Sequence, residues 1–245
     1  MPSLSRIPRL YVDAPLGEGA TVTLARNQCH YLLNVMRLRA GDTARLFNGR
    51  DGEWLAVITD AKRKSCALTC REKIADATPP PDIDYLFAPL KAARLDYMVQ
   101  KATEMGARRI RPVFTARTIA RRVNLERMRA NVIEAAEQSN LVWLPEVLKP
   151  LELDTLLDGW DATRRLVFCD EAAPVANPVT ALSAISPGPL ALLIGPEGGF
   201  TEQERARLHG LDFVHAISLG PRVMRADTAA VAALALVQST LGDWT

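Results

Sequence analysis

The chain has 245 residues, of which 48% are hydrophobic and 24% are charged, and its formal net charge is +2. This composition is ordinary for a soluble globular protein, and it excludes an intrinsically disordered chain. No run of eighteen apolar residues could span a membrane, and the first ten residues lack the apolar core of a signal peptide. We therefore expect a cytoplasmic protein with no membrane partner, built as one large domain or two modest ones.

Residues 1–75 predict a small β-rich domain. Short runs of β-forming residues, punctuated by Gly and Asp, occupy 9–12, 21–25, 42–49, 53–61 and 65–74. Residues 27–38 interrupt these strands with apolar residues at helical spacing. Residues 76–82 follow with three consecutive prolines, which cannot join the interior of a sheet or helix. We interpret residues 76–82 as a semi-rigid linker.

Residues 83–245 predict a second domain of alternating strands and helices. Strand-like runs occupy 84–90, 108–114, 164–170, 190–195 and 213–220. Helix-like runs occupy 94–107, 125–140, 201–210 and 226–242. Strands that alternate with helices favour a parallel sheet covered by helices on its faces. The expected fold class is therefore α/β, preceded by a small β-barrel-like domain.

Basic side chains gather in one segment. Eleven of the 30 Lys and Arg residues lie between residues 91 and 129, where only three Asp and Glu residues occur. A charge run is usually a solvated helix face, but this one consists mostly of arginine, whose guanidinium group suits phosphate. The segment favours a polyanionic partner such as RNA over a plain solvated surface.

The four cysteines, at positions 29, 66, 70 and 169, indicate neither a disulfide framework nor a metal site. They are too few and too scattered for the first, and no second Cys/His pair has zinc-finger spacing. No Ser or Cys partner stands beside His30, His209 or His215. We interpret these histidines as surface or packing residues and expect no metal.

Two segments near the C-terminus combine an apolar strand with a glycine-rich loop. Residues 190–194 lead into Gly195, Pro196, Glu197, Gly198 and Gly199, and Thr201 and Glu204 then form a capping box for the next helix. The strand that follows ends in the same way, with Gly-Pro at 220–221 and then Arg222 and Arg225. Ligands of open α/β sheets bind at the carboxyl ends of strands. We expect these two strand ends to lie side by side as two walls of one pocket. The spacing fits neither the dinucleotide fingerprint nor the P-loop.

Several segments together resemble a known family. They are RIPRLY, VMRLRAGDTARLFNG, QKATEMG, EAAEQ, IGPEGGF and LGPRVMRADTAAVAAL. In this order they resemble the RsmE family, the SPOUT-class methyltransferases that modify uridine N3 in small-subunit ribosomal RNA. The chain departs from the family pattern at Leu141, where an arginine is usual, and at Ala116, Met224 and Asp227.

The resemblance implies a fold, a cofactor and partners. The fold is a PUA-like RNA-binding β-barrel at 1–75 and a SPOUT methyltransferase domain at 83–245, with a C-terminal trefoil knot that no periodicity predicts. The methyl donor is S-adenosylmethionine, the substrate is 16S ribosomal RNA or the small ribosomal subunit, and the enzyme is a homodimer. Two other functions remain open: a SPOUT enzyme that methylates another RNA atom, and a non-catalytic RNA-binding protein.

The resemblance also implies site residues. Glu197 is expected to accept the N3 proton or to brace its loop, and Arg225 is expected to stabilise negative charge on the uracil. The expected cofactor-binding residues are Phe168, Leu193, Ile194, Gly195, Pro196, Gly198, Gly199, Ser218, Leu219, Gly220, Val223, Met224 and Thr228. The expected RNA-binding residues are Arg9, Arg37, Lys91, Lys101, Arg117, Arg121 and Arg122.

Residues 226–242 add an argument for dimerisation. No charged residue occurs between Ala229 and Val237, and small or branched apolar side chains occupy every side of the expected helix. A helix that is apolar all round must be buried on most faces. We expect a second subunit to cover the face that its own sheet leaves open.

Overall fold

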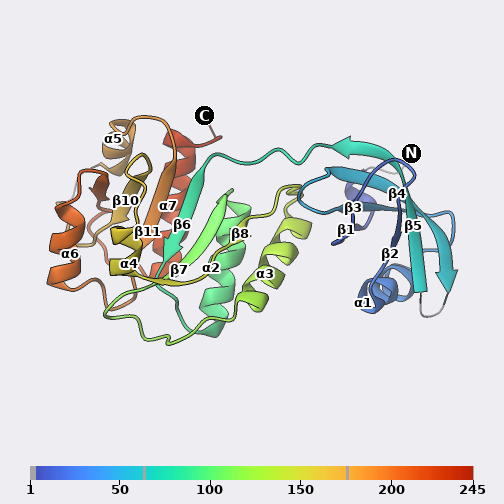
Figure 1. Ribbon diagram of the computed structural model, residues 1–245, viewed down its shortest axis with the longest axis horizontal. Coiled ribbons are helices and arrows are strands. Elements are labelled where there is room, and N and C mark those ends of the chain that lie inside the picture. The colour runs from blue at the N-terminus through green and yellow to red at the C-terminus, as the bar shows by residue number, and fades with distance from the viewer. Residues whose placement is uncertain (1–3, 63–64, 175–176, 245) are drawn as a thin grey trace. The chain divides into compact units, whose positions relative to one another are not determined.

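The computed structural model describes residues 4–62, 65–174 and 177–244, and the chain divides into two compact units (Figure 1). The first unit comprises Met1–Pro79 and Ala136–Leu144, and the second comprises Pro80–Ala135 and Pro145–Thr245. The division at Pro79 falls inside the Pro-rich stretch expected as a linker. No sequence pattern predicted that residues 136–144 group with the first unit.

The first unit is built on a five-stranded mixed sheet. Its strands are β1 (Arg9–Tyr11), β2 (Thr21–Thr23), β3 (Thr43–Phe47), β4 (Glu53–Lys62) and β5 (Ser65–Ala75). The order is β1-β3-β4-β5-β2, in which β1 pairs parallel to β3 and the other pairs are antiparallel. Three of these strands lie within the runs expected for them, and β4 and β5 each extend one residue beyond theirs. Among the described residues, β1 and β2 are the edge strands of this sheet, so closure into a barrel stays a prediction.

Alternation of side chains gives this sheet one buried face. Along β5, Cys66, Leu68 and Cys70 are fully buried, while the residues between them are partly exposed. The helical segment covers this face with Cys29 and Leu32. That segment is a short α1 (Arg26–His30) that continues as a π-helical turn, η2 (Tyr31–Val35), and a 3₁₀ turn, η1 (Leu4–Arg6), precedes β1.

Arg9 is a buried structural residue of the first unit, which corrects its expected place among the RNA-binding residues. Its side chain is 3% exposed, and its Nε donates to Oε1 of Glu53 at 2.8 Å. Its two terminal nitrogens donate to the backbone carbonyls of Ala136 and Leu141, each at 2.6 Å, and its guanidinium lies 3.6 Å from the ring centroid of Phe47. Arg9 therefore fastens residues 136–141 to strand β1.

The second unit is an open parallel sheet, as the alternating pattern predicts. Its path is β12-β10-β11-β6-β7-β8, with the short β9 also paired to β7, and every pairing is parallel. The strands are β6 (Ile83–Phe87), β7 (Arg109–Phe114), β8 (Glu146–Val147), β9 (Leu151–Glu152), β10 (Arg165–Cys169), β11 (Leu190–Ile194) and β12 (Val214–Ile217). The helices are α2 (Ala92–Glu104), α3 (Leu125–Gln138), α4 (Leu153–Asp158), α5 (Pro178–Ser183), α6 (Glu202–His209) and α7 (Ala226–Leu241).

Helices cover both faces of this sheet (Figure 1). On one face, α4 and α6 pack their leucines, such as Leu156 and Leu208, against Phe168 and Leu193. On the other, α7 contacts β11 and also packs against α2 and α5. All five residues of β11 are buried, which explains why its sequence is a continuous apolar run rather than an alternating one.

The strand order corrects one expectation about the ligand-binding edge. Strands β11 and β12 follow one another along the chain, but β10 lies between them in the sheet. Their loops are therefore separated by the end of β10. The short elements α4, α5, β8 and β9 were not expected either, and the trefoil knot stays a prediction. Among the described residues, no helix is both long and apolar enough to cross a bilayer.

The buried position of Arg9 leads to a prediction about stability. Glu53 is 4% exposed, and replacing Arg9 with methionine leaves it, among the described residues, with only the longer 3.4 Å ion pair to Arg45. We expect Arg9→Met to lower the free energy of unfolding by about 3 kcal/mol, because a buried carboxylate loses its main partner. Urea unfolding of the full chain, followed by tryptophan fluorescence, measures the change. The control, Arg50→Met, alters a half-exposed side chain, and equal unfolding midpoints for both variants would contradict the prediction.

Candidate functional site

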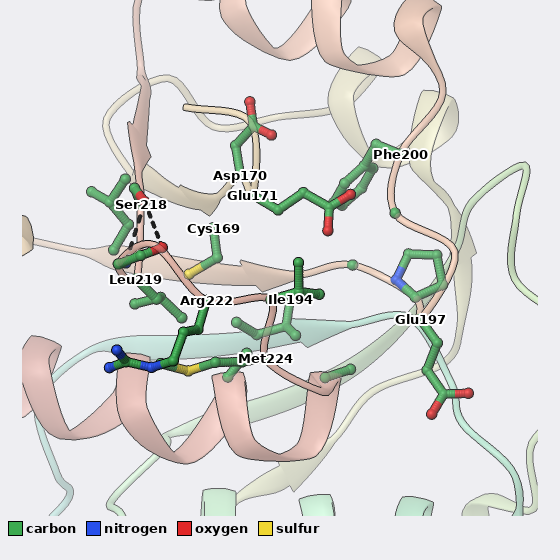
Figure 2. A pocket seen from close by; sticks show the side chains of 18 of the residues that line it. Cys169, Asp170, Glu171, Ile194, Glu197, Phe200, Ser218, Leu219, Arg222 and Met224 are labelled. Carbon is green, nitrogen blue, oxygen red and sulfur yellow. Dashed lines mark hydrogen bonds between the residues drawn. The ribbon is translucent and has the colours of Figure 1, made fainter. Parts of the chain in front are cut away.

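Three loops meet at the carboxyl edge of the parallel sheet and enclose a pocket, here called the first pocket (Figure 2). They follow β10, β11 and β12, and the first turn of α7 completes the wall. The loop after β10 contributes Cys169, Asp170 and Glu171, which sequence reasoning missed. The signal was present, because two carboxylates directly follow a buried strand that ends at the same edge.

Hydrogen bonds fix the loop that follows β11. The backbone N–H of Gly199 donates to the carbonyl of Pro196 at 2.9 Å, which closes a tight turn. The expected capping box is confirmed: the Thr201 hydroxyl accepts from the Glu204 N–H at 3.2 Å, and the Glu204 carboxylate accepts from the Thr201 N–H at 2.8 Å. A Cβ on Gly195 would overlap the ring of Phe200, so packing within the protein requires a glycine there. The loop is therefore rigid and closely packed.

The loop that follows β12 is held differently. The hydroxyl of Ser218, which is buried, accepts a hydrogen bond from the Gly220 N–H at 3.3 Å (Figure 2). Gly220 has φ of 106°, a conformation that side-chain-bearing residues rarely adopt. No heavy atom lies within 4 Å of the position a Cβ would take there. Unlike Gly195, Gly220 therefore has open space at its Cβ position, and Gly220 itself is one of the residues that line the pocket.

Asp170 anchors the third loop. It is 3% exposed, and its carboxylate contacts Arg205 at 3.3 Å and His209 at 3.0 Å, both from α6, while also accepting from the Ala172 N–H at 3.0 Å. The Asp170 N–H donates to the carbonyl of Ile217 at 3.0 Å, which ties β10 to β12. Burial raises the pKa of the neighbouring Cys169 thiol to about 12, so this thiol is neutral at physiological pH.

The structure brings most of the expected cofactor-binding residues together. Those that line the first pocket are Ile194, Gly195, Pro196, Gly199, Ser218, Leu219, Gly220, Val223 and Met224. Four do not line it: Phe168 and Leu193 are fully buried in the core behind it, and Gly198 and Thr228 face elsewhere. Arg222, which the sequence did not single out as a ligand contact, also lines the pocket.

The two expected catalytic residues occupy different environments. Glu197 forms an ion pair with Arg94 of α2, and its side chain extends away from Ser218 and Leu219 (Figure 2). Arg94 also lies 3.9 Å from the carboxylate of Asp227, so it bridges the loop after β11 and the start of α7. Arg225 is exposed at the N-terminal end of α7 and is not among the residues that line the pocket.

A second pocket lies beside the first, and the basic residues Lys91, Arg94 and Arg117 line it. Pro196 and Glu197 line both pockets, so one loop forms a shared wall. Arg117 donates to the carbonyl of Gly198 at 2.9 Å and thereby braces this wall.

The other basic residues divide into solvated and paired groups. Arg37, Arg121 and Arg122 are exposed, and no ion pair to any of them occurs within the part of the chain that the structure describes. Lys101 instead pairs with Glu104, and Arg127 with Asp96. The expected polyanion surface is thus smaller than the basic run in the sequence. No group of three or more His, Cys, Asp or Glu side chains suited to a metal ion occurs among the described residues.

The chain is similar in sequence to known RNA methyltransferases. Residues 78–238 match the RNA methyltransferase domain family, and residues 24–69 match the RNA methyltransferase PUA domain. The chain is 32% identical over 232 residues to the ribosomal RNA small subunit methyltransferase E of Rickettsia conorii. The aligned residues cover 94% of each protein.

Two solved structures are similar over nearly the full length. One is the ribosomal RNA small subunit methyltransferase E of Neisseria gonorrhoeae bound to S-adenosyl methionine, with a TM-score of 0.87, 29% identity and coverage of 98% of this chain and 100% of that one. The other is a methyltransferase from Legionella pneumophila in complex with the bound cofactor SAM, with a TM-score of 0.83, 28% identity and coverage of 97% and 99%.

The open space at Gly220 yields a prediction for the expected cofactor. We expect Gly220→Val to reduce S-adenosylmethionine affinity at least tenfold, or about 1.4 kcal/mol, because the new side chain projects into space that the ligand needs. Isothermal titration calorimetry measures the affinity, and circular dichroism checks that the variant is folded. The matched control is Gly41→Val, since Gly41 has φ of 93°, has nothing within 4 Å of its Cβ position and lies in the first unit. Equal affinities in the two variants would contradict the pocket assignment.

Proposed function

Because this chain belongs to the RNA methyltransferase family that includes the ribosomal RNA small subunit methyltransferase E proteins, we propose that it methylates N3 of a uridine in 16S ribosomal RNA, with S-adenosylmethionine as the methyl donor. The observation that carries the proposal is the first pocket, where three loops converge at the carboxyl edge of a parallel sheet. The second unit supplies this pocket, and the PUA domain supplies an RNA-binding module.

The residues of the first pocket fit S-adenosylmethionine. Ile194, Leu219 and Met224 offer apolar surface for an adenine ring, and the empty side of Gly220 admits a ligand close to the backbone. Glu171 places a carboxylate in the same pocket, suited to hydroxyl groups or positive charge (Figure 2). When bound, the cofactor supplies an electrophilic methyl group, so the chain's own task is to bind and orient the two reactants.

We assign the proton chemistry to Glu197. Uridine N3 carries a proton at neutral pH, and a nearby carboxylate can accept it. Of the acidic side chains that line the two pockets, Glu197 is the one that lines both, so it lies between the two reactants. Arg94 holds this carboxylate in place through their ion pair. Arg225 is the cation that we assign, as the resemblance implies, to the negative charge that develops on the uracil oxygens.

RNA contacts are assigned to the exposed basic residues of the second unit. Lys91 and Arg117 line the second pocket, and Arg121 and Arg122 follow Arg117 closely along the chain. Their charges attract the phosphate backbone without regard to sequence. Since N3 lies on the Watson–Crick edge of the base, the target uridine must be unpaired or turned out of its helix.

We further propose that the active unit is a cytoplasmic homodimer in which α7 meets its counterpart. Ala230, Ala233 and Leu234 of this helix are buried within their own subunit. Val231, Ala232 and Ala235 remain partly exposed, so an apolar stripe stays uncovered in one chain. Its small side chains permit close approach of a second helix, which supports pairing through this face.

Methylation of RNA from a strain that lacks this enzyme tests the function. We expect the protein to transfer one methyl group to N3 of a single uridine in 16S RNA or in the small subunit, as found by mass mapping of the modified nucleoside. A methyl group on another atom would assign a different SPOUT activity. RNA binding without S-adenosylmethionine binding in calorimetry would show a non-catalytic protein.

The proposed dimer gives a prediction for α7. Val231→Glu puts a charge on the partly exposed stripe, and we expect it to produce a monomer with activity reduced at least tenfold, because a charge buried in an interface is costly. Leu234→Glu is unsuitable, since Leu234 is fully buried in its own subunit. The control, Ser239→Glu, changes an exposed position of the same helix. Analytical ultracentrifugation measures the oligomeric state, and a folded, fully active Val231→Glu monomer would refute the dimer.

A further inference from the structure

The second pocket is a separate hollow with its own chemistry. Three segments form it: the loop and first turn of α2, the loop after β7, and residues 196–198. It has a volume of about 460 Å³ and shares only Pro196 and Glu197 with the first pocket. The two pockets therefore adjoin at these two residues, and ligands bound in them would lie next to one another.

The charges in the second pocket suit a phosphate-bearing ligand. Three cations line it, Lys91, Arg94 and Arg117, against one acid, Glu197, which is already paired with Arg94. Lys91 is exposed and makes no ion pair within the described residues. Arg117 donates one N–H to the Gly198 carbonyl, and its remaining N–H groups can donate to phosphate oxygens.

The rest of the lining suits a flat, uncharged ring. Leu90, Ala93 and Ala120 are apolar or small, and Ile119 exposes 68% of its surface at the rim. Ile119 therefore adds apolar surface at the rim, which a bound ring could cover. Arginine guanidinium planes also stack on bases that have left their helix.

We propose that the second pocket receives the target nucleotide, a pyrimidine turned out of its RNA strand, with its phosphates on Lys91 and Arg117. The inference rests on the proposed function, because it places the acceptor base next to the cofactor, where the two pockets adjoin at Pro196 and Glu197 and N3 can face the methyl carbon directly. Glu197, whose side chain faces this pocket and pairs with Arg94, then contacts the base rather than the cofactor. Arg121 and Arg122 hold the flanking strand outside the pocket.

Filling the pocket tests this assignment. Ala93→Trp and Ala120→Trp introduce a large ring from two different segments, and Ala130→Trp places the same ring on an exposed site of α3 that lines neither pocket. The RNA is a fragment that contains the mapped uridine with 2-aminopurine as its neighbour, whose fluorescence rises when the uridine leaves the stack. With saturating protein, we expect this rise for the wild type and for Ala130→Trp, and its loss for both pocket variants.

The kinetic and binding constants separate pocket filling from other defects. For Ala93→Trp and Ala120→Trp we expect kcat/KM to fall about 100-fold or more, with S-adenosylmethionine affinity unchanged in calorimetry. The double variant Arg121→Ala/Arg122→Ala should show the opposite pattern: weaker RNA binding and a flatter dependence of log K on log salt, but a normal fluorescence rise at saturation.

Several outcomes would overturn the assignment. A normal fluorescence rise and normal kcat/KM in both pocket variants would show that the base binds elsewhere. Conversion of both variants to monomers in analytical ultracentrifugation would show that a second copy of the chain fills the pocket. A fluorescence rise in the wild type that the pocket variants lose, without methylation of uridine N3, would uphold the pocket and refute the proposed function.

Discussion

The parallel alignment of β12, β10 and β11 is the constraint on which the site depends. Parallel strands end at the same edge, so three loops that are distant in the sequence are brought together there. The loops are fixed by contacts made behind them: Asp170 to α6, Glu204 to the Thr201 N–H, and Phe200 against Gly195. Burial of the whole of β11 supplies the stability that holds these loops at the surface.

The loop after β11 contributes residues to both pockets. One side closes the first pocket with Ile194, Gly195 and Pro196, and the other presents Glu197 to the second pocket and to Arg94. In the proposed reaction, both ligands contact this loop, so the same backbone positions them next to one another for direct transfer. Arg94 adds a link to Asp227 at 3.9 Å, so the start of α7 is held to the same wall.

Local sequence patterns predicted much of this arrangement, and their failures have physical causes. The capping box at Thr201 and the apolar run of β11 depend on neighbouring residues, so both were predicted correctly. The place of β10 between β11 and β12 depends on the path of the whole chain, and no local period encodes it. The loop of Asp170 was missed because β10 was not expected beside β11 and β12, although two carboxylates directly follow this buried strand.

The partners of the arginines were also difficult to predict from the sequence. A guanidinium group can pair with a carboxylate or with a phosphate, and the sequence alone does not distinguish the two. Arg9 became a buried link among Glu53, Ala136 and Leu141, while Arg121 remained exposed. The distant residues 136–141 decided the role of Arg9, and these could not be recognised as its neighbours from residues 1–75.

A crystal structure of the protein with S-adenosylhomocysteine and an RNA fragment containing the target uridine tests the central claim most directly. Our account predicts the adenosine part of S-adenosylhomocysteine in the first pocket against Gly220, and the uracil ring in the second pocket beside Pro196 and Glu197, with N3 facing the sulfur atom. Binding of the uracil ring outside the second pocket, or of the adenosine part away from the three loops, would contradict it.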